Sequence, residues 1–187
     1  MTKLPVPFPT LHSSQLLIDS STDCDHLPPS REDWFVRSVL TDQSLQIPPG
    51  LSLTRLFIGS FTLRSLRRFE LSQLNELELV KVGWNSFTRC DNEDMNKSSG
   101  GFFCVEQCPR LKTIEIGEYS FSDFEHMEIS QLPSLESLHF EGSSFYYASS
   151  IDFHGRNSER CQWRPSSSSF SVLWNGHGLL LPCCLLS

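Results

Sequence analysis

The chain has 187 residues, of which 39% are hydrophobic and 20% charged, and its formal net charge is -7. This length fits one domain or one short array of repeats. The charge is spread without a stripe of Lys and Arg, which argues against a nucleic-acid partner because phosphate contacts need clustered basic side chains. No apolar run approaches the length of a membrane span, so membrane insertion is not expected.

The first 46 residues divide into two predicted segments. Residues 1–29 are rich in Pro and Ser and are expected to be loose; they also lack the apolar core of a signal peptide, which favours a cytoplasmic location. Residues 30–46 are predicted to be a capping segment that contains a short helix beginning near Ser30. The apolar residues at helical spacing in this segment are Trp34, Phe35, Val39 and Leu40.

Residues 47–153 contain four units with one shared pattern. The units begin at Ile47, Leu71, Val105 and Ile129, and their LxxLxL cores are Leu53–Leu56–Ile58, Leu77–Val80–Val82, Leu111–Ile114–Ile116 and Leu135–Leu138–Phe140. The starts lie 24 residues apart, except that 34 residues separate the second from the third. The excess of ten is assigned to a polar loop at 90–101. A fixed period in this range indicates a repeat fold, with each core on a short strand.

Two further features recur in each unit. A Ser-Phe pair follows the core at Ser60-Phe61, Ser86-Phe87, Ser120-Phe121 and Ser144-Phe145, and these four Phe side chains are predicted to stack as an internal column. Short alternating segments then begin at Phe69, Phe103, Met127 and Ile151. Gly59, Gly83 and Gly117 are expected to let the backbone turn off the strands.

These residues carry a resemblance over roughly 47–153. The LxxLxL cores resemble a leucine-rich repeat protein, and Asn85 stands where that family's motif has its asparagine. The IG-x-x-SF ending is most similar to the BspA-like subtype. The resemblance implies an α/β-type repeat that is mostly β: a short solenoid with one parallel sheet face. The resemblance is unspecific for function, and the first functional hypothesis is a non-enzymatic binding module or scaffold for an unknown protein partner.

The outward positions of the four strands are the candidate partner-binding residues. They are Arg55, Phe57, Leu79, Lys81, Thr113, Glu115, Ser137 and His139. An alternative interpretation is that outward charges only satisfy one another across the strands. Two sets are self-complementary in this way, Glu78–Lys112–Glu136 and Lys81–Glu115.

Motifs for catalysis, cofactors or metals are not found in the sequence. It contains no GxSxG, no P-loop and no HExxH, so neither an enzyme nor a cofactor is predicted. Cys104 and Cys108 lack the paired CxxC spacing of a zinc site and are interpreted as core or loop cysteines. A Cys90–Cys104 disulfide would require a secreted protein. The acidic run 91–96 is interpreted as a solvated loop, and its Asn96 begins a glycosylation sequon.

Residues 154–187 lose the period and are predicted to be an irregular, disordered tail. The last four, Cys184-Leu185-Leu186-Ser187, match a prenylation signal, for which chance in an unpatterned tail is the alternative. The tail also suggests a truncated or frame-shifted gene. A second hypothesis is therefore an inert or structural fragment of a longer repeat protein, and a third is a lipid-anchored repeat protein.

Overall fold

The computed structural model describes residues 47, 49–88 and 100–154 together with five further strands. Those strands cover residues 15–18, 33–36, 160–162, 170–174 and 179–180, and it is their backbone pairing that is described. The loop predicted at 90–101 falls mostly outside this part of the chain, since residues 89–99 are not described and residue 101 already belongs to a strand.

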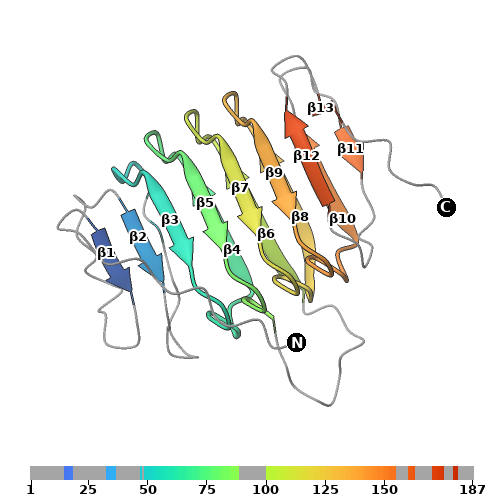
Figure 1. The fold of residues 1–187 in the computed structure, drawn as a ribbon. Coiled ribbons are helices and arrows are strands. Elements are labelled where there is room, and N and C mark those ends of the chain that lie inside the picture. Colours follow the sequence, from blue (N-terminus) through green and yellow to red (C-terminus); the bar gives the residue numbers. More distant parts are fainter. Residues whose placement is uncertain are drawn as a thin grey trace.

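The described strands form two sheets that face each other (Figure 1). The long sheet has the order β1 (Gln15–Ile18), β2 (Asp33–Val36), β3 (Arg55–Ile58), β5 (Leu79–Val82), β7 (Thr113–Ile116), β9 (Ser137–Phe140), β12 (Phe170–Trp174) and β13 (Leu179–Leu180). The pairing is parallel from β1 to β9 and antiparallel from β9 through β12 to β13. All four predicted core strands are confirmed in it as β3, β5, β7 and β9.

The short sheet consists of β4 (Arg68–Ser72), β6 (Gly101–Glu106), β8 (Phe124–Ser130), β10 (Ser150–His154) and β11 (Arg160–Gln162). Its first four strands are parallel, and β11 joins β10 antiparallel. These four parallel strands, β4, β6, β8 and β10, contain the short alternating segments of the sequence. From β3 to β10 the chain alternates between the two sheets. The expectation of one parallel sheet was therefore incomplete, and the described residues contain no helix that would justify an α/β class.

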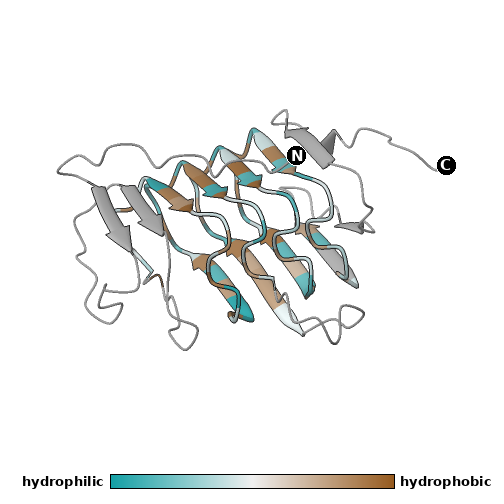
Figure 2. Ribbon diagram, turned by 60° about the horizontal axis from the view of Figure 1, so that its bottom comes forward, coloured by the Kyte–Doolittle hydropathy of each residue, from teal (hydrophilic) through white to brown (hydrophobic). Residues whose placement is uncertain are grey.

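The core between the sheets follows from period-two burial in β3, β4, β5, β7 and β9. The register of β3, β5, β7 and β9 puts Leu56, Val80, Ile114 and Leu138 in one line and Ile58, Val82, Ile116 and Phe140 in the next, all at most 3% exposed. Figure 2 shows hydrophobic residues on the strands of both layers. Each buried side chain of this size contributes about 1.5–3 kcal/mol.

The predicted phenylalanine column is correct for three of its four members. Phe87 and Phe121 stack with ring centroids 4.3 Å apart, and Phe121 and Phe145 follow at 5.1 Å. Phe61 is not in the column, because its side chain is 49% exposed. Leu63 takes its place at 4% exposure, 24 residues before Phe87. The Ser60-Phe61 pair thus lies two residues too early to be equivalent to the other pairs.

Left-handed residues recur at the corners between strands. Three sets have φ between 52° and 60°: Phe61, Asn85, Tyr119 and Ser143; Leu63, Phe87, Phe121 and Phe145; Gln73, Gln107 and Gln131. Left-handed backbone is uncommon for residues other than Gly, and its regular return indicates that neighbouring units turn in the same way. The residues aligned with Asn85 share its backbone conformation although their side chains differ.

Gly83 and Gly117 have a different role from the one predicted, since neither has a positive φ. A Cβ on Gly117 would lie 2.6 Å from the carbonyl carbon of Gly83 and 2.7 Å from Trp84 N. A Cβ on Gly83 would lie 2.6 Å from Ser60 N. These glycines are required because the backbones of successive units approach each other too closely for a side chain.

Both ends of the chain differ from the expectations. Residues 33–36, where a helix was predicted, form strand β2 in register with β3, because an open parallel edge offers hydrogen-bonding partners that outweigh local helical spacing. Strand β1 lies within the segment expected to be loose. Strands β11, β12 and β13 lie within the tail that was expected to be irregular. The remaining parts of 1–46 and 155–187 lie outside the described residues.

Candidate functional site

The eight predicted partner-binding residues all lie on the long sheet, in two rows that cross four parallel strands. One row is Arg55, Leu79, Thr113 and Ser137, and the other is Phe57, Lys81, Glu115 and His139. Within each strand these positions alternate with fully buried ones, so the two rows share the face that points away from the short sheet. The sequence pattern alone was sufficient to find this grouping.

The exposure of the two rows is uneven. Arg55 and Lys81 are exposed, and the other six side chains are partly buried. Phe57 and Leu79 lie on adjacent strands in different rows, so the face combines partly accessible apolar side chains with charged ones. Interface cores contain apolar anchors surrounded by polar residues, and this mixture has both components.

Charged side chains on and beside this face form ion pairs between neighbouring units. Lys81 Nζ lies 2.6 Å from Glu115 Oε2, and Lys112 Nζ lies 3.7 Å from Glu78 Oε2. Arg110 adds ion pairs to Glu76 and, at 3.9 Å, to Glu78. The structure thus supports the alternative interpretation for Lys81–Glu115 and for Glu78–Lys112. Exposed pairs of this kind contribute about 0–1 kcal/mol each.

Cys104 and Cys108 are buried free thiols. Cys104 stands between Glu70 and Glu128 in the register of the short sheet. Burial raises the pKa of the Cys104 thiol to about 12, and the nearby carboxylates of Glu106, Glu128 and Glu70 act in the same direction. Burial raises the pKa of Cys108 to about 11. A thiol with a raised pKa is a poor nucleophile near neutral pH. Cys90, the other member of the conditional disulfide, lies outside the described residues, so that disulfide stays a prediction.

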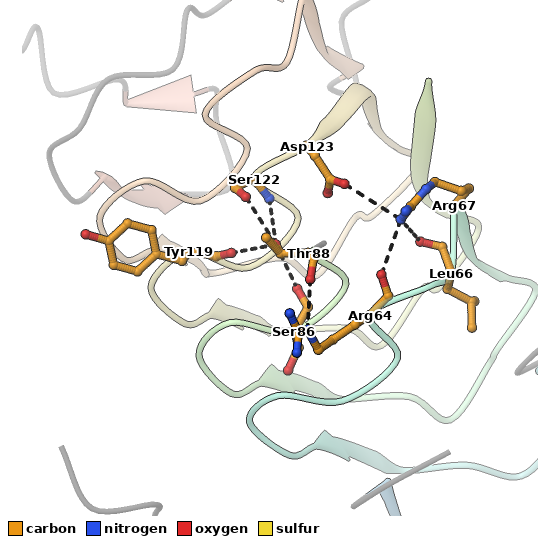
Figure 3. Close-up of polar contacts among 8 residues, drawn as sticks. All are labelled: Arg64, Leu66, Arg67, Ser86, Thr88, Tyr119, Ser122 and Asp123. Carbon is orange, nitrogen blue, oxygen red and sulfur yellow. Dashed lines mark hydrogen bonds and ion pairs between the residues drawn. The ribbon is translucent and has the colours of Figure 1, made fainter. Parts of the chain in front are cut away.

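A polar cluster at the corner of the stack was missed by sequence reasoning (Figure 3). Arg67 Nη1 lies 3.7 Å from Asp123 Oδ2 and donates to Leu66 O at 2.9 Å. Asp123 is 8% exposed, so this ion pair is largely shielded from water. The two residues are 56 positions apart and share no motif. Only the stacking of the units brings them together.

Thr88 is the centre of the same cluster. Its Oγ1 donates to Tyr119 O at 2.6 Å and accepts from Ser122 N at 3.1 Å, while Arg64 Nε donates to Thr88 O at 3.2 Å. These bonds link three consecutive units at the last described residue before the predicted loop. The hydrogen bonds of the cluster tie Thr88 to the units on both sides of it.

The described residues contain neither a metal-binding cluster nor a membrane-spanning helix. No three or more His, Cys, Asp or Glu side chains in this part of the chain are grouped so that they could hold a metal ion. No helix in the same part has the length and hydrophobicity needed to cross a membrane. The acidic run 91–96 and Cys184 lie outside the described residues, so their interpretations stay predictions.

No protein-family model, curated protein or solved structure matches this chain.

Proposed function

We propose that this chain is a leucine-rich-repeat solenoid that acts as a non-enzymatic protein-binding module through the outward face of its long sheet. The observation that carries the proposal is the alignment of Phe57 and Leu79 with charged and polar residues across four parallel strands. Four units with the same buried lines and the same left-handed corners support the solenoid. Such a scaffold presents an ordered row of side chains that needs no rearrangement to bind.

The size of the face limits the contact. The four strands that carry these residues lie about 4.8 Å apart, each with about four residues at about 3.3 Å, and make a face of about 250 Å² in plane. A standard interface buries about 800 Å² on each partner. We therefore expect a weak contact on the sheet alone, or a stronger one that also uses the loop predicted at 90–101.

The ion pairs favour a second candidate, a structural repeat without a partner of its own. Lys81 and Glu115 already satisfy each other at 2.6 Å, so they would give a partner little net electrostatic attraction. In this case the face is a solvated surface of a larger repeat protein, and changing it has no effect on binding.

Affinity purification with matched variants separates the two candidates. The test variant combines Phe57→Ser, Leu79→Ser and Lys81→Ser on the long sheet. The control variant combines Arg68→Ser, Glu70→Ser and Glu128→Ser on the short sheet. Both must keep the circular dichroism spectrum of the original chain. The binding proposal requires a partner that is retained by the original chain and the control and lost by the test variant. Equal recovery by all three chains would remove this face from consideration, and no saturable partner would favour the structural candidate.

A further inference from the structure

Three aromatic side chains lie where the chain leaves successive strands of the long sheet. Phe61 follows β3 and is 49% exposed, and Tyr119 follows β7 and is 50% exposed. Trp84 follows β5 and is partly buried, with its ring 4.1 Å from that of Phe61 between centroids. Exposed aromatic side chains that gather along one edge are typical of interaction sites. We call the residues at 60–61, 84–85, 118–119 and 141–143 the corner edge.

We propose that the corner edge binds a proline-rich peptide in the polyproline II conformation, with a basic side chain beside the prolines. This edge is separate from the outward sheet face, so the inference does not depend on the function proposed above. Three observations support it: a fixed spacing of the backbone positions that carry Phe61 and Tyr119, the charge of the edge and the direction of Tyr119.

The spacing is fixed by hydrogen bonds that continue beyond the strands. Phe61 N donates to Trp84 O at 3.0 Å, Asn85 N to Glu118 O at 2.8 Å, and Tyr119 N to Gly142 O at 3.1 Å. Phe61 and Tyr119 are equivalent residues with φ of 59° and 60°. They are therefore two strand spacings apart, about 9.6 Å.

This separation matches the ligand that we propose. A polyproline II helix has three residues per turn with a rise of about 3.1 Å each, so its side chains repeat on one face every 9.3 Å or so. Prolines at positions i and i+3 of a peptide would then meet the Phe61–Trp84 pair and Tyr119. Aromatic surfaces bind such peptides well because the polyproline II helix is already ordered before binding.

The negative charge of the corner edge indicates which kind of residue should flank the prolines of the ligand. Glu118 and Glu141 lie on it, with Glu141 Oε2 accepting a hydrogen bond from Glu118 N at 3.2 Å, and its sequence contains no Lys, Arg or His. A Lys or Arg next to the prolines would complement these carboxylates. Figure 3 shows the Tyr119 ring directed away from the polar cluster that its backbone carbonyl joins, which leaves the ring available to a ligand.

The test is a titration of the full chain with the peptide acetyl-KPAAPAAPK-amide, followed by isothermal calorimetry and by amide NMR shifts. Saturable binding below about 1 mM is expected. The matched peptide acetyl-KAAAAAAAK-amide keeps both charges and should not bind. The variants Phe61→Asn and Tyr119→Ser introduce residues that the chain already has at the equivalent left-handed positions 85 and 143. Each should weaken binding about tenfold.

Tyr146→Ser is the control variant, because Tyr146 is 47% exposed but lies off the corner edge. It should leave the affinity unchanged. Absence of saturable binding to the original chain, or equal affinities in all three variants, would overturn the proposal. The chain's own residues 5–9 read PVPFP. If removing residues 1–10 raises the affinity for the peptide, the edge is occupied by this segment and not by a separate partner, which would also overturn it.

Discussion

Ser120 donates a hydrogen bond from its Oγ to Gly83 O at 2.6 Å, and so joins two units at a point where neither is in a strand. The same bond recurs from Ser86 to Gly59 at 2.7 Å and from Ser144 to Gly117 at 2.9 Å. Ser120 Oγ also accepts from Ser86 N at 3.1 Å. In the last three Ser-Phe pairs the serine is therefore a buried polar link, while the phenylalanine after it belongs to the core.

Replacing Ser120 with Ala should lower the free energy of unfolding by about 2–3 kcal/mol, because Gly83 O and Ser86 N lose their buried partner together. Urea denaturation measures this change. Ser137→Ala, on the outward face, is the matched control and should change stability by less than about 0.5 kcal/mol. Equal losses in the two variants would mean that the hydroxyl link contributes nothing specific.

The burial of Leu63 leads to a second prediction. It is the opposite of what the Ser-Phe alignment of the sequence, which places Phe61 in the column, would predict. Leu63→Ala should destabilise the fold by about 2–5 kcal/mol, because it opens a cavity at the end of the phenylalanine column. Phe61→Ala removes a larger side chain that is 49% exposed, and it should cost much less. Thermal denaturation of both variants shows which substitution lowers the stability more. A larger loss for Phe61→Ala would restore the sequence-based alignment.

Gly117→Ala should destabilise the protein by about 1–3 kcal/mol or more, since its new Cβ would overlap the backbone of Gly83 and Trp84. The next unit provides the control. Glu141 stands at the position equivalent to Gly117, and Glu141→Ala adds no atom there. Chemical denaturation of the two variants should show a clear loss only for Gly117→Ala, and comparable stabilities would indicate that the units can separate slightly at this corner.

The buried thiol of Cys108 should make stability depend on alkaline pH. Burial raises its pKa from 9.0 to about 11. Above pH 9 the unfolded thiol loses its proton while the folded thiol keeps it, so the contribution is intact below pH 9 and is lost as the pH rises toward 11. The slope for one such thiol approaches about 1.4 kcal/mol per pH unit.

Comparison with Cys108→Ala isolates this contribution from that of other groups. Urea denaturation at several pH values between about 8 and 11 gives the difference in unfolding free energy between the two proteins. This difference in unfolding free energy should be constant up to pH 9 and should decrease as the pH rises further. A difference that stays constant to pH 11 would show that the thiol ionises equally in the folded and unfolded states.

The sequence predicted the strands and their outward residues because both depend on local alternation. Leu56 and Ile58 alternate with Arg55 and Phe57 in the chain as they do in β3, and the same phase returns in the next three units. Alternation fixes which side chains share a face, whatever lies on the other side of the core. This is why all eight candidate residues lie together on one face of the long sheet.

The tertiary structure decided what depends on contacts between units. The alignment by Ser-Phe pairs placed Phe61 in the column, and the burial of the side chains shows that Leu63, 24 residues before Phe87, completes it. Arg67 and Asp123 meet through stacking and carry no local signal. Residues 33–36 have helical spacing and yet extend the sheet, since the open edge of β3 supplies hydrogen-bonding partners that the local pattern does not contain. Local periodicity thus determined the faces of the strands, and the close approach of successive units determined the corners between them.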